Sequence, residues 1–137
     1  MSKKLQPQFT SSGYLKLKNT VFQPISPYSP GFFPPDTLSG NQVLINYRSN
    51  HVYSISLYEF LSRYENQQLP ATFLKDKIIL IGATHSQFDN NYDDKWMTPY
   101  PYTQDNNRNT PGVLIQAQMI SQILGTVTSD RALLSFL

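Results

Sequence analysis

The sequence contains no cysteine and carries little net charge. Without thiols it can form no disulfide, no thiolate zinc site and no cysteine-based catalytic centre. Eleven basic and nine acidic residues give a net charge of +2, and the basic side chains are spread from Lys3 to Arg131. That spread disfavours nucleic acid as a partner, because nucleic-acid binding usually needs a concentrated basic patch. Wholly apolar runs are short, as in residues 78–81, far below the ~20 residues that cross a bilayer.

The composition is that of one folded domain. The 137 residues are 39% hydrophobic and 15% charged, which is unlike a disordered chain. Residues 1–39 are predicted to form a loose N-terminal arm, with an edge strand or hairpin where residues 14–18 alternate in period two. Five prolines between Pro24 and Pro35 predict an irregular loop. Residues 40–131 are predicted to form the main domain. Residues 132–137 turn apolar and are expected to lead toward a membrane segment.

An α/β fold is predicted for the main domain, with a mainly parallel sheet and flanking helices. Residues 43–47 and 77–81 are consecutive apolar runs, typical of strands buried on both faces of a parallel sheet. Ser56 and Glu59 have capping-box spacing and open an amphipathic helix. Thr110 is expected to cap a second helix that ends at Gly125. Strand–helix alternation favours parallel pairing. Residues 83–109 show no periodicity and are expected to form a functional loop.

Four blocks of sequence, taken in order, resemble the CHASE domain of type two. They are residues 42–48 (QVLINYR), Ser56-Leu57 opening a helix, residues 77–84 (KIILIGAT), and Thr98-Pro99 followed by Pro111-Gly112-Val113. The resemblance covers about residues 40–131. The loop before Thr98 is longer than the family pattern, so the acidic position of the family corresponds to Asp89, Asp93 or Asp94. Gln116 stands where the family often has histidine, so no imidazole role is carried over.

The resemblance implies a sensory input domain outside the cytoplasm of a bacterial, notably cyanobacterial, receptor. Such a domain is held by flanking membrane helices and passes its state to an output domain of the same protein. That output is a cyclase, a histidine kinase or a protein kinase. The expected partners are a small-molecule ligand and a second copy of the chain, with which it would form a homodimer. The alternative is a dimerisation module that binds no ligand, with the loop and the N-terminal arm at its interface.

Enzymatic chemistry is not predicted, because the sequence offers no coherent set of acid, base and nucleophile. Residues 89–94 place oxygen ligands at alternate positions, as a calcium loop does. However, Asp94 stands at the place of the turn glycine and Tyr100 at that of the closing glutamate. A solvated acidic loop is therefore favoured over a calcium site. His51 and His85 have no metal-ligand spacing. No metal and no cofactor is expected.

A ligand, if one binds, is expected where the 84–109 loop covers the carboxyl ends of the two predicted strands. The competing interpretation is that the loop packs down and fills this crevice. Arg48 is interpreted either as an anion anchor or as one partner of a structural salt bridge. The candidate ligand-binding residues are Tyr47, Arg48, Thr84, His85, Asp93, Asp94, Trp96 and Thr98.

Overall fold

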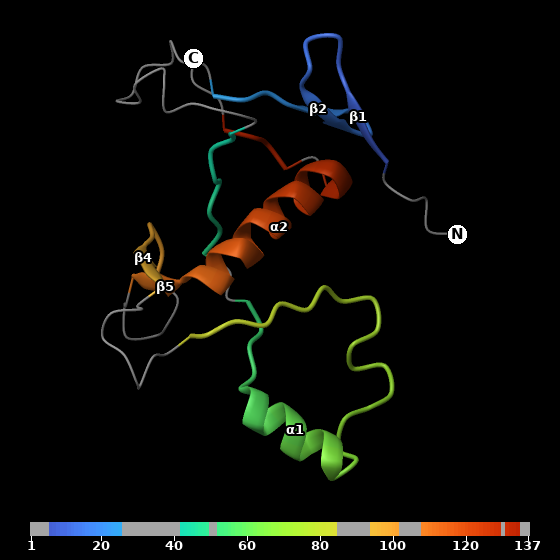
Figure 1. Cartoon of the computed structure of the whole chain (residues 1–137), viewed down its shortest axis with the longest axis vertical. Helices are drawn as coiled ribbons and strands as arrows, with labels where there is room; N and C mark the ends of the chain where they lie inside the picture. The colour runs from blue at the N-terminus through green and yellow to red at the C-terminus, as the bar shows by residue number, and fades with distance from the viewer. Residues whose placement is uncertain are drawn as a thin grey trace. The chain divides into compact units, whose positions relative to one another are not determined.

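The computed structural model of the chain describes residues 6–25, 42–49, 52–84, 94–101, 108–129 and 131–134. It divides into two compact units. The first contains Met1–Arg48 and Gln118–Leu137, and the second contains Ser49–Ala117. Figure 1 shows the helices and strands of both.

A three-stranded antiparallel sheet opens the first unit, in the order β1 (Pro7–Phe9), β2 (Leu15–Leu17) and β3 (Thr20–Phe22). The turn between β1 and β2 places Gly13 at a φ of 78°, which a residue without Cβ adopts at little cost. A two-residue loop that starts at Lys18, with a φ of 53°, joins β2 to β3. Where the alternation of residues 14–18 predicted an edge strand or a hairpin, β2 and β3 thus form a hairpin within a three-stranded sheet.

Helix α2 (Gly112–Ser129) holds an extended segment, residues 42–48, through two glutamine side chains one helical turn apart. Gln122 donates to the Leu44 carbonyl oxygen (2.9 Å) and accepts from the Asn46 backbone N–H (2.8 Å). Gln118 bonds the backbone of Arg48 in the same way, donating at 3.1 Å and accepting at 3.2 Å. Figure 1 shows this segment running beside α2. The two amides thus take up backbone groups that a neighbouring strand would otherwise pair with.

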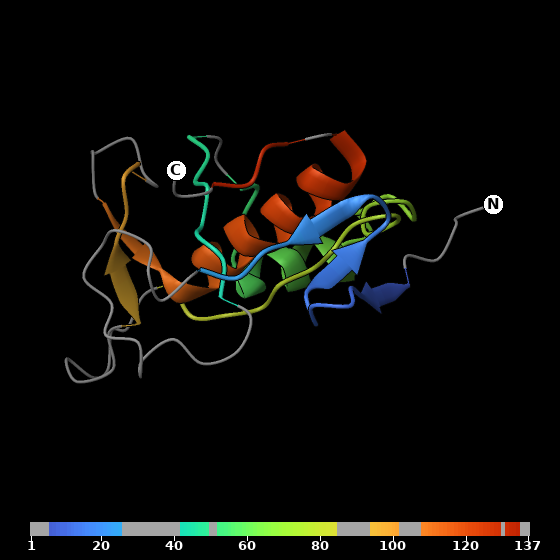
Figure 2. The same cartoon turned by 90° about the horizontal axis from the view of Figure 1, so that it is seen from above.

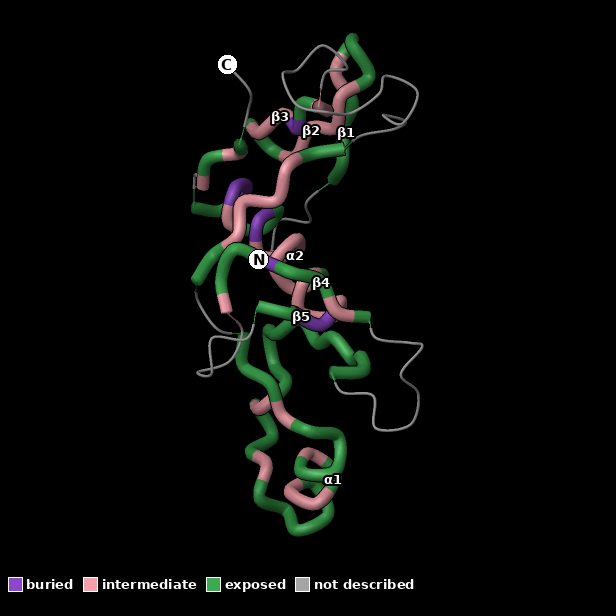
Figure 3. Tube along the Cα trace, turned by 90° about the vertical axis from the view of Figure 1, so that its left-hand side faces the viewer, coloured by how far each residue is buried: buried purple, intermediate pink, exposed green. Residues whose placement is uncertain are grey.

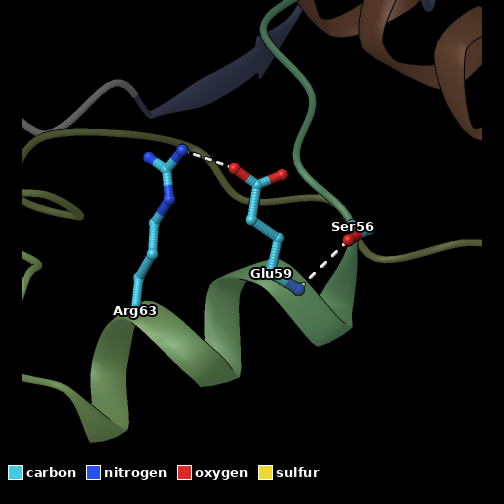
Figure 4. A network of polar contacts seen from close by, with 3 residues as sticks. All are labelled: Ser56, Glu59 and Arg63. Carbon is cyan, nitrogen blue, oxygen red and sulfur yellow. Dashed lines mark hydrogen bonds and ion pairs between the residues drawn. The ribbon is translucent and has the colours of Figure 1, made fainter.

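In the second unit, helix α1 (Leu57–Glu65) begins as the sequence predicts. Ser56 Oγ accepts from the Glu59 backbone N–H at 3.1 Å. The Glu59 carboxylate turns toward Arg63 one turn later and pairs with its guanidinium, rather than reaching back to Ser56 as in a full capping box (Figure 4). After the helix, the Phe73 ring packs on Phe60, with centroids 6.3 Å apart.

Two further strands precede α2 in the second unit. Strands β4 (Lys95–Met97) and β5 (Asn109–Pro111) form an antiparallel pair, with Trp96 opposite Thr110. Figure 2 shows β5 running directly into α2. Residues 95–97 and 109 of the predicted 83–109 loop thus belong to strands. The helix starts at Gly112, after the residues expected to cap it, and continues through Gly125 to Ser129.

The prediction of a mainly parallel α/β fold is wrong. Both sheets are antiparallel and the described residues contain only two helices. Residues 43–47 are extended but bonded to α2 instead of a strand. Residues 77–81 are also extended, with no strand partner among the described residues. Hydrophobicity had indicated strands at both places, but it specifies only which side chains avoid water and not where the backbone finds its hydrogen bonds.

Buried residues are few among those described, as Figure 3 shows. The buried apolar residues are Phe22 and Val127 in the first unit and Pro111 in the second, and four polar residues are also buried: Thr98, Thr110, Gln122 and Thr126. Ile78 and Ile81 are 60% and 86% exposed. Much of the apolar side-chain surface is therefore left facing outward.

Candidate functional site

The first turn of α2 is where separate parts of the second unit meet. Gly82 lies so close to Val113 that a Cβ on the glycine would come within 2.6 Å of the Val113 Cβ. Asp94 reaches the same turn, since its carbonyl oxygen accepts from the Gly112 backbone N–H at 2.9 Å. A Cβ on Gly112 would lie 2.6 Å from the Asp94 Cγ. Both glycines are thus needed for close approach, and they bring the 77–84 segment and β4 to the start of α2.

The Asp94 carboxylate lies at the positive end of the helix dipole and orients the neighbouring tryptophan. Its Oδ1 accepts from the Trp96 indole N–H at 3.0 Å. A negative charge at the first turn of a helix is stabilising. The amide of Gly112 at this helix start is bonded to Asp94 itself. Trp96 keeps its N–H satisfied while 63% of its surface stays exposed.

Next to Trp96, two threonines hold the β4–β5 hairpin together, and one of them, Thr110, lies opposite Trp96 in the strand pair. The Thr98 and Thr110 hydroxyls lie 2.7 Å apart, and both residues are buried. Thr98 Oγ1 also donates to the carbonyl oxygens of Tyr100 (2.8 Å) and Arg108 (3.4 Å). Each threonine precedes a proline, so the same dipeptide occurs on both sides of the hairpin. This network fixes β4 and, with it, the direction of Trp96.

Of the eight candidate residues, the structure groups three, Asp94, Trp96 and Thr98, at β4. Thr84 is exposed and follows Gly82 by two residues. His85 and Asp93 lie outside the described residues, as does Asp89. Tyr47 and Arg48 belong to the first unit, at the end of the segment bonded to α2. Residues 43–47 and 77–81, whose carboxyl ends were predicted to flank the ligand, are not strands.

Gln118 and Gln122 were not among the residues predicted to matter, and Thr110 and Gly112 were assigned only to the start of the second helix and to a family motif. A signal for the glutamines was present, since they lie four residues apart on a predicted apolar helix. Polar residues at that spacing share one helix face. Over the described residues, no group of three or more histidine, aspartate or glutamate side chains is placed to hold a metal ion.

Arg48 faces another arginine. Its Nη2 atom would lie 3.0 Å from a Cβ on Gly125, and the Arg131 Cδ would lie 3.2 Å from that same point. Burial and, second, the charge of Arg48 hold the pKa of Arg131 below its ordinary value. The Arg131 Nη2 donates to the Asn46 carbonyl oxygen. Arg63 and Glu59 form the ion pair found within the described part of the chain, so the salt bridge considered for Arg48 is not seen there.

The site so described consists of an exposed indole bonded to a carboxylate at a helix start, and of two buried threonines bonded to each other in the same hairpin. A family model, that of the CHASE2 domain, matches residues 4–137. The chain therefore belongs to the CHASE2 family, a family of extracellular sensory domains. Neither the curated proteins nor the solved structures searched gave a match to the chain. Neither α1 nor α2 in the described part has the length and hydrophobicity required for a membrane span.

Proposed function

We propose that this chain is the ligand-binding input domain of a membrane-anchored receptor, working outside the cytoplasm and without catalytic activity. Its state passes to an output domain of the same protein, a cyclase, a histidine kinase or a protein kinase. Membership of a sensory family supports the role, and the geometry at the start of α2 supports a place for the ligand.

The observation that carries the proposal is the exposure of Trp96. Its indole is 63% exposed although its N–H is bonded to Asp94. Met97 and Tyr100 nearby in sequence are 82% and 44% exposed. Aromatic side chains held in one orientation and left open to solvent are typical of binding surfaces, because a ligand that stacks on them loses little protein entropy. The buried pair of Thr98, which follows β4, and Thr110 in β5 supports the rigidity that this requires.

A second function, assembly without a ligand, is favoured by a different surface. On α1 three large side chains are exposed, Leu57 at 63%, Tyr58 at 84% and Tyr64 at 67%, although Phe60 packs on Phe73. Apolar side chains at helical spacing that cover no core are a common feature of helix–helix interfaces. This alternative predicts self-association and no bound small molecule.

Native mass spectrometry of the purified domain distinguishes the two functions. A ligand-binding domain is expected to show an added small-molecule mass on the monomer or dimer, whereas an assembly module is expected to show a dimer of the bare chain mass. Trp96 is the single tryptophan, so its fluorescence reports directly on β4. A copurified compound, removed and added back, is expected to change that fluorescence saturably.

Substitutions then locate the site. Trp96→Ala is expected to abolish the response of the full-length receptor while the Tm of the domain is unchanged, because the ring is mostly exposed. Tyr58→Ala, which removes an exposed aromatic ring from α1, is the matched control and is expected to respond normally. A normal response in Trp96→Ala would show that β4 is not the ligand site.

A further inference from the structure

Two arginines that are distant in sequence converge on one point of α2. Arg48 ends the extended segment along the helix, and Arg131 follows the helix end. Gly125 makes room for both, because a side chain there would press on Arg48 Nη2 and on Arg131 Cδ. Arg131 is anchored from two sides, with its backbone N–H donating to the Gly125 carbonyl oxygen at 3.2 Å and its Nη2 donating to Asn46.

The remaining terminal nitrogen of Arg131 has no acceptor. Its Nη1 atom is buried and has no hydrogen-bond partner within the described part of the chain. Leaving a charged donor buried without an acceptor costs more than leaving a neutral one. The nearby charge of Arg48 adds repulsion, in keeping with the lowered pKa of Arg131. A bound anion would reduce the repulsion between the two guanidinium groups and would give the unsatisfied donor an acceptor.

The negative end of the α2 dipole explains only in part why two arginines lie beside Gly125. Cations are favoured beside the final carbonyl groups of a helix, and Lys18 occupies such a position, donating to the Val127 carbonyl oxygen at 3.3 Å. Carbonyl dipoles attract Arg131 in the same way. They supply no acceptor for Nη1, and they give no reason for a second guanidinium to lie over Gly125.

We propose that Arg48 and Arg131 bind a small oxyanion, a carboxylate or phosphate group, beside Gly125. A guanidinium presents paired N–H groups that match two oxygens of such a group, which a single ammonium does not. Arg48 is exposed and can adjust, whereas Arg131 is fixed by its bonds to Asn46 and Gly125. The site is independent of the surface around Trp96 and does not rest on the function proposed for it.

The test is a titration of the whole chain, labelled with ¹⁵N at its arginine side chains, with sodium acetate or sodium phosphate. Sodium chloride keeps the ionic strength constant. The signals of Arg48 and Arg131 are expected to shift and saturate, whereas that of Arg63, already paired with Glu59, stays in place. Saturation with acetate alone identifies a carboxylate site, with phosphate alone a phosphate site, and with both a general oxyanion site.

Matched variants complete the test. Arg48→Gln is expected to weaken binding by about tenfold or more, because half of the charged donors are lost. Its fold is expected to survive, since the bonds from Arg48 to Gln118 are made by the backbone. Arg63→Gln is expected to bind as the unaltered chain does. Shifts of Arg48 and Arg131 no larger than that of Arg63 would overturn the proposal, as would undiminished binding by Arg48→Gln.

Discussion

Replacing Gln122 with methionine removes a side-chain amide from a buried position and changes little else. Gln122 is 3% exposed, and methionine is similar in length and in helix propensity. The change leaves the Leu44 carbonyl and the Asn46 N–H without the partners that they have at 2.9 and 2.8 Å. An unsatisfied buried backbone group costs about 1–3 kcal/mol. Because both bonds are only partly buried, water recovers some of this, and we expect a loss of about 2 kcal/mol.

Hydrogen exchange at the Asn46 amide measures this loss locally. It is preferable to a single global unfolding curve, because a chain with two compact units need not unfold in one step. A loss of about 2 kcal/mol corresponds to exchange that is faster by about thirtyfold. Gln118→Met is the matched control. Its bonds to Arg48 are exposed, so water replaces them and we expect a cost of about 0.5 kcal/mol.

Equal exchange rates for the Asn46 amide in Gln122→Met and in the unaltered chain would refute this reasoning. They would mean that the extended segment is not held by the glutamine. An equal loss of stability in Gln122→Met and Gln118→Met would also contradict the reasoning. It would mean that the burial of a glutamine side chain does not decide how much its hydrogen bonds contribute.

Three further predictions concern the helix ends and the paired arginines. Ser56→Ala is expected to cost about 1 kcal/mol by losing the cap on the Glu59 N–H, seen as reduced helical circular dichroism; an unchanged spectrum would contradict the cap. Gly112→Ala is expected to displace the Asp94 carboxylate from the helix start and lower stability in urea by about 1–2 kcal/mol, whereas a stabilised variant would show that the close approach is unimportant. Arg48→Gln is expected to raise the stability of the anion-free chain by about 0.3 kcal/mol at low salt and by less at high salt. A gain that grows with salt would exclude repulsion as its cause.

Local patterns in the sequence gave correct predictions where neighbouring residues decide the structure. The alternation at residues 14–18 predicted the hairpin, and the spacing of Ser56 and Glu59 predicted the start of α1. Both depend on contacts within a few residues. The start of α2 was misplaced because Thr110 and Pro111 pair with β4, a contact that brings in residues far back along the chain.

The candidate site was predictable only in part. Aromatic and acidic residues close to the Thr98-Pro99 dipeptide directed attention to Asp94, Trp96 and Thr98, which the structure does bring together. The sequence did not reveal Arg131 as the neighbour of Arg48, because no periodicity relates residues separated by an extended segment and a whole helix.

By itself, the sequence determined the β2–β3 hairpin, the start of α1, the presence but not the bounds of α2, the absence of thiol chemistry and, through its ordered motifs, the family. Those properties depend on composition or on short-range spacing. Only the tertiary structure decided what the apolar segments at residues 43–47 and 77–81 do. Hydrophobicity makes a segment leave water but does not choose the partner for its backbone. For residues 44–48 that partner is a pair of glutamines on α2, since a side-chain amide offers the same donor and acceptor as a neighbouring strand.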